Sequence, residues 1–301
     1  MFAPGFAHAA ELRDFAGTWV MRLGGRNLFV LTLTRDGAGL RGTWDRPLTY
    51  ASANGIFANM RGGVRHDSVS SRFADGVLHL TIHNTSDPQD EDSFAMTVDR
   101  DRAALAREDP GVVAAPYSLE RSAPGATVAA DWEPNRIYSS GDSDIPNDEM
   151  AKIFAEDQRV RTAATLDWNT VGRTDADRRE QTRKLLAAGA LHTGKDYEEA
   201  AFVFQHGDKP EHYLLAHTLA MVAVSKGDAT AIWIAAATLD RYLENIGQKQ
   251  ILGTQFSSDP QRHWTQEPYD RDLISDALRQ QLGVPTQALQ AEQLKAYQSQ
   301  K

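Results

Sequence analysis

The hydrophobic pattern of this 301-residue chain changes its period near residue 121. In residues 77–83, Leu78, Leu80 and Ile82 alternate with polar residues, which is typical of a strand with one buried face. After residue 147 the apolar residues recur at a spacing close to 3.6, which indicates amphipathic helices. A strand-rich half followed by a helix-rich half predicts an α+β protein built as two domains.

The first half contains about eight or nine short apolar runs separated by turn signals such as 35–39 and 87–92. Antiparallel strands without any helical period predict a closed barrel or a sandwich, and we expect an antiparallel β-barrel over residues 11–121. Residues 122–146 are rich in Gly, Pro, Ser and Asp, so they are predicted to be a linker. Residues 147–301 are predicted to form an all-α bundle of helix hairpins.

The segment Phe15-Ala-Gly-Thr-Trp-Val-Met-Arg-Leu23 contains a Gly-x-Trp motif on the first expected strand. It resembles the opening strand of the calycin barrels, the lipocalin, avidin and fatty-acid-binding families, in which the Trp plugs the closed end. A second Trp on a strand, Trp44 in Gly42-Thr-Trp44, agrees with the resemblance. It implies a barrel of about eight strands, whose interior is either filled by side chains or holds one small apolar ligand. A packed accessory domain is the alternative to a ligand-binding barrel.

The helical half shows helix signals and a weak repeat. Thr174-Asp-Ala-Asp177 has the form of a capping box that begins a helix, and Pro210 suits the first position of another. Small and apolar residues recur at an offset of 33 positions. Residues 186, 187, 190, 191 and 194 correspond to residues 219, 220, 223, 224 and 227, and each pair is identical or similar. Tetratricopeptide-like repeats have a similar period, although their full pattern is missing. We therefore expect a compact, repeat-like bundle.

Polar residues on inward-facing stripes are the first candidates for a site. Trp233, Ala236, Ala237, Asp240 and Leu243 share one helical stripe, so Asp240 is expected to be buried. Asp157 and Arg161 similarly extend an apolar stripe that begins at Met150. A buried charge needs a partner, so Asp157 or Arg161 is expected to face Asp240 or Arg241 across the bundle. These groups form either a network that fixes helix register or a functional site.

Further polar side chains surround the same helices. His206 and His217 are candidate acid–base groups, with Asp240 orienting a histidine and Arg241 or Arg161 holding an anionic group. His212 and His217 are five residues apart, about 140° around a helix, which argues against a shared metal ion. The predicted catalytic residues are His206, His217, Asp240 and Arg241, and the predicted ligand-binding residues are Asp157, Arg161, Gln205, Gln250 and Gln255.

Several of these positions form a recurring pattern. Residues 147–258 resemble an uncharacterised bacterial domain whose signature is Gln-His-Gly, then Leu-Asp-Arg, then Gly-Thr-Gln. The resemblance implies a shared pocket but no reaction, and Leu252 replaces an aromatic residue that commonly precedes Gly-Thr-Gln. The segments that carry it are Glu156-Asp-Gln-x-x-Arg161, Asp167-Trp168, Gln205-His-Gly207, Leu215-Ala-His217, Gly227, Ala237–Leu243 and Gly253-Thr-Gln-Phe256.

Composition narrows the classes of function. A net charge of −9 argues against a nucleic-acid partner, and the absence of Cys excludes disulfides, thiolate nucleophiles and Cys-based metal sites. No apolar run is long enough to span a membrane. Residues 1–10 are interpreted as the tail of a secretion signal or a disordered end, because Ala7-His8-Ala9 has the form of a signal-peptidase site. This predicts a periplasmic or secreted protein, with a cytoplasmic protein as the alternative.

Three functions agree with these features. We expect a protein that binds a small molecule or peptide through a polar pocket in the helical domain, with the barrel as a second candidate binding site. The alternatives are a metal-independent enzyme that uses His, Asp and Arg for acid–base chemistry, and a protein–protein interaction module. No cofactor and no metal ligand set is predicted.

Overall fold

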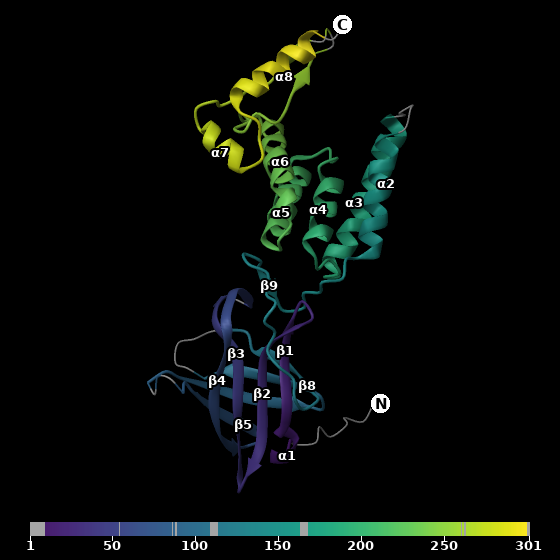
Figure 1. Cartoon of the computed structure of the whole chain (residues 1–301). Helices are drawn as coiled ribbons and strands as arrows, with labels where there is room; N and C mark the ends of the chain where they lie inside the picture. Colours follow the sequence, from purple (N-terminus) through teal and green to yellow (C-terminus); the bar gives the residue numbers. More distant parts are fainter. Residues whose placement is uncertain are drawn as a thin grey trace, which may run out of the picture. The chain divides into compact units, whose positions relative to one another are not determined.

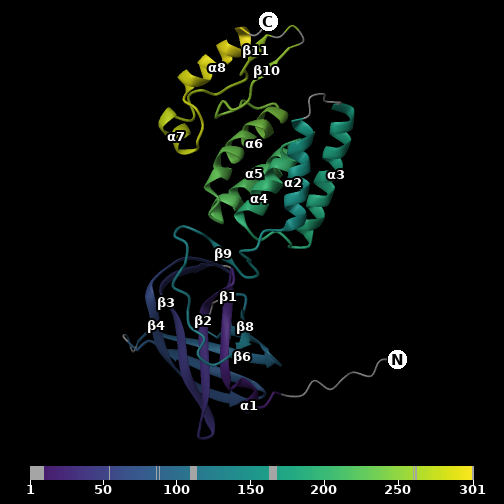
Figure 2. The same cartoon turned by 45° about the vertical axis from the view of Figure 1, so that its right-hand side comes forward.

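The computed structural model of the chain describes residues 10–53, 55–85, 87, 89–108, 114–162, 168–259, 261 and 263–299. It divides into two compact units, Met1–Ser143 and Asp144–Lys301. Figures 1 and 2 show that strands make up the first unit and that helices dominate the second. The predicted signal tail lies outside the described residues except for Ala10, and so does Asp167 of the signature.

The first unit contains a closed antiparallel barrel of eight strands, which confirms the predicted β-barrel. Neighbouring strands pair in the order β3-β2-β1-β8-β7-β6-β5-β4, and pairing of β3 with β4 closes the sheet. The short α1 helix (Leu12–Phe15) precedes the first strand. The strands are β1 (Gly17–Leu23), β2 (Arg26–Asp36), β3 (Gly39–Ala53), β4 (Ile56–Ala74), β5 (Val77–His83), β6 (Glu91–Asp99), β7 (Arg102–Arg107) and β8 (Tyr117–Ser122).

The tryptophan of the Gly-x-Trp motif is fully buried in this barrel. Its indole N–H donates to the Phe15 carbonyl at 2.8 Å, and the Arg121 guanidinium lies 4.1 Å from the Trp19 ring centroid. Arg121 also donates to the carbonyls of Asp14 and Ala16. Trp19 therefore joins α1, β1 and the end of β8 at one end of the barrel.

The barrel interior is largely filled by side chains. The Phe29 ring packs against Trp44, Tyr50, Phe57 and Tyr117, with ring centroids 4.8–5.9 Å apart. Such packing excludes a large central channel. A hollow of about 530 Å³ remains, and its lining includes Met21, Phe57, Arg107 and Tyr117.

Residues 122–146, predicted to be a linker, contribute in large part to the first unit. Val128 is buried against Val20 and Val30 of the barrel wall. Tyr138 is fully buried and begins the two-residue strand β9 (Tyr138–Ser139), which pairs with β4. The Gly and Pro content of this segment therefore marks turns in a chain that packs on the barrel.

The second unit is predominantly helical. Figure 2 shows α2 to α6 as a set of neighbouring helices. Among these helices α4 packs on α5, α5 packs on α6, and α2 packs on both α3 and α4. The helices are α2 (Asp148–Arg161), α3 (Trp168–Ala187), α4 (Gly194–Phe204), α5 (Pro210–Ser225), the 3₁₀ turn η1 (Ala229–Ala231), α6 (Ile232–Asn245), α7 (Asp276–Gln281) and α8 (Gln287–Ser299).

Two local predictions in this unit are wrong. Thr174 lies inside α3, where its hydroxyl donates to the Val171 carbonyl, so the expected capping box does not begin a helix. The 33-residue offset pairs Gly194, the first residue of α4, with Gly227, which follows the end of α5. The matched positions are therefore not structurally equivalent. Pro210 does begin α5, because the first turn of a helix does not use the missing N–H.

The last part of the second unit is not purely helical. Strands β10 (Ser257–Ser258) and β11 (Trp264–Thr265) form a short antiparallel pair after α6. Arg279 of α7 and Gln290 of α8 are both buried and donate to the Leu252 carbonyl. These contacts tie the two terminal helices to the loop that follows α6.

Candidate functional site

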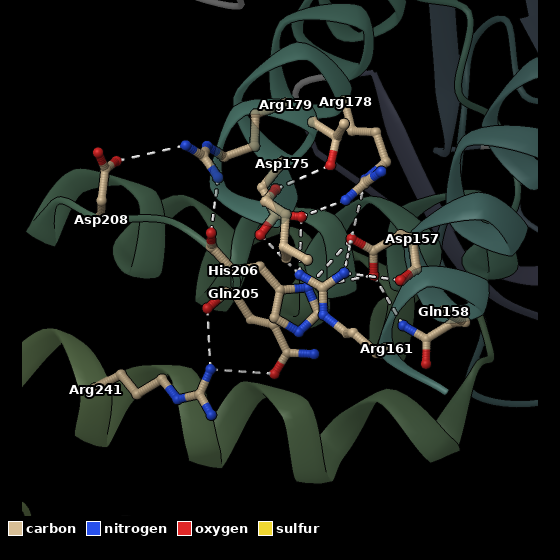
Figure 3. Close-up of polar contacts among 12 residues, drawn as sticks. Asp157, Gln158, Arg161, Asp175, Arg178, Arg179, Gln205, His206, Asp208 and Arg241 are labelled. Carbon is tan, nitrogen blue, oxygen red and sulfur yellow. Dashed lines mark hydrogen bonds and ion pairs between the residues drawn. The ribbon is translucent and has the colours of Figure 1, made fainter. Parts of the chain in front are cut away.

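A network of charged side chains joins α2, α3 and the end of α4. Asp157 is fully buried, and Arg161 binds it and Asp175 at 2.9 Å each. Arg178 pairs with Asp175, and its Nε lies 3.4 Å from Asp157. Figure 3 shows these side chains pointing toward one another from the two helices. We call Asp157, Arg161, Asp175, Arg178 and His206 the Asp157 network.

His206 enters this network from the turn after α4. Its Nδ1 lies 3.2 and 3.3 Å from the two carboxylate oxygens of Asp157. The Arg179 guanidinium donates to the His206 carbonyl at 2.7 Å and thereby fixes the turn. Nε2 of His206 has no hydrogen-bond partner in the described part of the chain and is not a buried atom, so it reaches solvent.

Arg241 forms a second cluster next to this network. Its Nε donates to Oε1 of Gln255 at 2.9 Å, and its Nη1 donates to the Gln205 carbonyl at 2.9 Å. Figure 3 shows the Arg241 side chain reaching from α6 toward Gln205, the residue before His206. We call Gln205, Arg241 and Gln255 the Arg241 cluster.

The loop after α6 holds Gln255 in place. Asp240, fully buried as predicted, accepts hydrogen bonds from the backbone N–H groups of Ile251, Leu252 and Thr254 and from the Thr254 hydroxyl. The prediction that Asp157 or Arg161 faces Asp240 or Arg241 is therefore wrong, since among the described residues neither contacts Asp240 or Arg241. Loop N–H groups satisfy this carboxylate, whereas Asp157 finds its cations on α2 and α3. Asp240 also makes no contact with a histidine in the described residues, so it does not orient one.

Two other predicted residues have structural partners. Gln250 is fully buried, donates to the carbonyls of Gln255 and Gln266, and accepts from the Gln255 N–H. His217 Nδ1 lies 2.9 Å from the Ala235 carbonyl, and in the described part of the chain it contacts neither the Asp157 network nor the Arg241 cluster. The structure thus connects Gln205, Arg241, Gln250, Gln255 and Asp240 in one set of contacts and Asp157, Arg161 and His206 in the adjacent one.

Arg241 differs from the other buried or half-buried arginines in its lack of a carboxylate partner among the described residues. Each other buried or half-buried arginine that the structure describes has a carboxylate oxygen within 4.0 Å, including Arg161, Arg178 and Arg279. Arg241 is half-buried, and no carboxylate lies that close to it among the described residues. Burial lowers the pKa of Arg241 from its ordinary value, against weaker opposing effects of Tyr213 and Glu244. A desolvated cation held only by neutral groups is suited to receive an anion.

The Arg241 cluster also leaves donors available. Nη2 of Arg241 and Nε2 of Gln205 have no hydrogen-bond partner in the described residues, and neither belongs to the buried unsatisfied atoms. Both therefore reach solvent. The backbone around them is fixed, because the Tyr213 hydroxyl donates to the Gly207 carbonyl at 2.6 Å.

Three contributors to these contacts were missed at the level of sequence: Asp175, Arg178 and Thr254. Asp175, Arg178 and Thr182 are all buried and lie on one face of α3 at a spacing of three and four residues. The helical spacing of these polar residues could therefore be seen in the sequence. It was not used, because residues 174–177 were interpreted as a capping box at the start of a helix. Thr254 belongs to the Gly-Thr-Gln motif, and nothing in its spacing indicates contact with Asp240.

Comparison of the chain with protein-family models, curated proteins and solved structures finds no match. Within the described residues no group of three or more His, Asp or Glu side chains is arranged to hold a metal ion. None of the helices in the described part of the chain has the length and hydrophobicity that a bilayer crossing requires.

Proposed function

We propose that the helical unit binds a small molecule through an anionic group, a carboxylate or a phosphate, at the Arg241 cluster. The observation that carries this proposal is the half-buried Arg241 guanidinium without a carboxylate partner among the described residues. Two neutral acceptors orient the guanidinium and leave its positive charge uncompensated. Arginine binds planar carboxylate and phosphate oxygens with paired hydrogen bonds, which suits this arrangement.

The neighbouring groups favour a ligand with further acceptors. Gln205 offers an amide N–H beside Arg241, and His206 offers an imidazole nitrogen from the next position along the chain. Arg161 is a poor anion holder, because Asp157 and Asp175 already compensate its charge. The proposed ligand-binding residues are therefore Arg241, Gln205 and His206, with Gln255 positioning the guanidinium.

A binding titration tests this function. Inorganic phosphate, acetate and succinate serve as probes, and binding to the full chain is measured by calorimetry. We expect at least one of them to bind, and Arg241→Gln to weaken it by tenfold or more, as the loss of roughly 1.4 kcal/mol of a charged hydrogen bond implies. Arg173→Gln, which removes an exposed arginine of the same unit, should bind like the native protein.

The result of this titration distinguishes an anion-binding site from a protein–protein interaction module. Absence of binding for all three anions, or equal binding by the native protein and Arg241→Gln, would remove the proposal. A role of these helices in protein contacts would then be the better explanation.

An acid–base enzyme is the second candidate, and the contact between His206 and Asp157 favours it. A carboxylate at Nδ1 holds the imidazole in one orientation and leaves Nε2 free for proton transfer. An anionic substrate bound at Arg241 would place its neighbouring atoms within reach of the same turn. Under this alternative His206→Gln lowers turnover of a substrate while anion binding at Arg241 persists.

The barrel supports a separate proposal. We infer a calycin-like barrel from the Gly-x-Trp motif together with the buried Trp19, and its remaining hollow of about 530 Å³ could hold part of a small apolar ligand. The hollow lies against the aromatic rings of Phe57 and Tyr117. Quenching of tryptophan fluorescence by an apolar probe such as anilinonaphthalene sulfonate, reduced in Phe57→Ser, would support this site.

We propose that the Gln-His-Gly, Leu-Asp-Arg and Gly-Thr-Gln segments belong to one domain of the kind they resemble, since Arg241 of the second segment contacts both Gln205 of the first and Gln255 of the third. Export of the protein to the periplasm or medium rests on the signal-peptidase-like residues 7–9 alone.

A further inference from the structure

Three side chains on the outer face of the barrel form a relay of hydrogen bonds. Ser70 Oγ lies 2.9 Å from Nε2 of His83, and Nδ1 of the same imidazole lies 2.7 Å from Oε1 of Glu91. They come from the neighbouring strands β4, β5 and β6, whose register places His83 directly opposite Glu91. We call Ser70, His83 and Glu91 the outer triad.

The roles of the two imidazole nitrogens follow from their partners. An ionised Glu91 only accepts hydrogen bonds, so Nδ1 of His83 carries the proton. Nε2 of the neutral ring is then an acceptor, and the Ser70 hydroxyl donates to it. This is the protonation pattern in which a histidine acts as general base toward a serine, with a carboxylate fixing its orientation.

Ser70 of the outer triad lines a hollow in the barrel surface. The hollow has a volume of about 460 Å³ and is lined mainly by polar residues. Arg72 lies on the same strand as Ser70, is exposed, and makes no ion pair within the described residues. Its guanidinium can approach negative charge that develops beside Ser70. The lining residues are Ser70, Ser71, Arg72, His79, Leu80, Thr81, Ser93 and Glu108.

We propose that Ser70 is a nucleophile for the hydrolysis of small carboxylic esters, with His83 as base, Glu91 as the group that orients it, and Arg72 as the stabiliser of the oxyanion. This activity is independent of the anion site in the helical unit, because every residue involved belongs to the barrel. An ester with a short acyl group fits the hollow, which has few apolar walls.

The proposed reaction has two halves. In the first, Ser70 Oγ forms a bond to the ester carbonyl carbon while its proton passes to Nε2 of His83. The bond between that carbon and the alcohol oxygen then breaks, and the leaving alcohol takes the proton from His83. In the second half, a water molecule attacks the acyl-Ser70, its proton passes through His83 to Ser70 Oγ, and the carboxylic acid leaves.

Covalent labelling tests the nucleophile directly. The full-length protein is treated with diisopropyl fluorophosphate, which phosphorylates activated serines with loss of fluoride, and the peptides are examined by mass spectrometry. We expect one label, on Ser70. Ser68→Ala is the matched control, since Ser68 is an exposed serine of the same strand β4, does not line the hollow, and makes no hydrogen bond to a histidine in the described part of the chain.

Hydrolysis of p-nitrophenyl acetate gives the second readout. Ser70→Ala and His83→Gln should lower kcat/KM by at least ~100-fold, while Ser68→Ala stays within about twofold of the native value. Because these residues are surface side chains, circular dichroism should show the native spectrum for each variant. Absence of the label at Ser70, or equal hydrolysis by Ser70→Ala and the native protein, would overturn the proposal and leave the outer triad as a surface hydrogen-bond chain.

Discussion

The backbone N–H and the hydroxyl of Thr254 both donate to Oδ2 of Asp240, at 2.9 and 2.8 Å. The other oxygen of Asp240 accepts from the N–H groups of Ile251 and Leu252. One buried carboxylate on α6 thus fixes the path of the loop that carries Gln255. Since Gln255 holds the Arg241 guanidinium, the geometry of the proposed anion site depends on a residue that does not line it.

Replacement of Asp240 by alanine should destabilise the protein by about 2–4 kcal/mol, because three loop N–H groups lose their acceptor in a buried place. The free energy of unfolding in urea, followed by circular dichroism, measures this loss. Asp240→Asn keeps one carbonyl oxygen as an acceptor and should lose less. An unchanged midpoint for Asp240→Ala would contradict the role of this carboxylate.

Replacement of Asp157 by asparagine should cost about 3 kcal/mol, since it leaves Arg161, Arg178 and the His206 imidazole with less compensating charge in a buried place. The change in unfolding free energy is again the measurement. Glu156→Gln is a suitable control on the same helix, because its ion pair with Arg159 is exposed and its loss should leave stability unchanged.

The two carboxylates of the Asp157 network should also be coupled. Arg161 and Arg178 each contact both Asp157 and Asp175, so the effects of Asp157→Asn and Asp175→Asn are not expected to add. A double-mutant cycle should show a coupling energy of at least ~0.5 kcal/mol. Strict additivity would mean that the two carboxylates act independently.

Glu199 of α4 predicts a dependence of stability on pH. Its carboxyl is buried, one oxygen lacks a hydrogen-bond partner, and the Lys195 ammonium lies 3.8 Å from the other. Burial raises the pKa of Glu199, and Lys195 opposes this shift only in part. The folded protein therefore keeps this proton at a pH where the unfolded chain has lost it, and stability falls as the pH rises from the ordinary glutamate range through the raised pKa.

Glu199→Gln removes the titrating group and keeps the shape of the side chain. We expect the variant to be more stable than the native protein at neutral pH and the difference to disappear below about pH 4, where glutamate is protonated in both states. The unfolding free energies of the variant and the native protein, measured from below pH 4 to neutral pH, test this expectation. A constant difference at all pH values would exclude the titration of Glu199 as the cause.

The alternation of apolar residues predicted a closed barrel or a sandwich, and the helical period was sufficient to predict that Asp240 is buried. Both patterns report which side of an element faces the core. They do not show which groups a buried side chain will contact. Asp240 was therefore predicted to face a charged residue of another helix, whereas its hydrogen-bond partners are N–H groups of the loop after α6. Trp233 shows a further limit, since it shares the stripe of Asp240 but is 44% exposed near the start of α6.

The candidate site was predictable in its residues and not in its connections. Gln205, Arg241 and Gln255 were identified from a recurring signature, but their contacts depend on how α4, α6 and the loop after α6 pack. His217 was selected with them as a candidate site residue, but its Nδ1 lies 2.9 Å from the Ala235 carbonyl, away from Arg241. Short polar motifs therefore indicate candidate residues without showing which of them contact one another.

The most direct test of the proposed anion site observes the Arg241 side chain itself. Its Nε–H donates to Gln255 at 2.9 Å, which should slow exchange with water and make the proton visible in a ¹H–¹⁵N NMR spectrum. The resonance is assigned by its loss in Arg241→Lys, and inorganic phosphate is then added to the native protein. We predict a shift of this resonance that saturates with phosphate concentration and leaves the Arg279 Nε–H resonance in place. An Arg241 resonance that stays unchanged in this titration, and also in titrations with acetate and succinate, would contradict the proposed function.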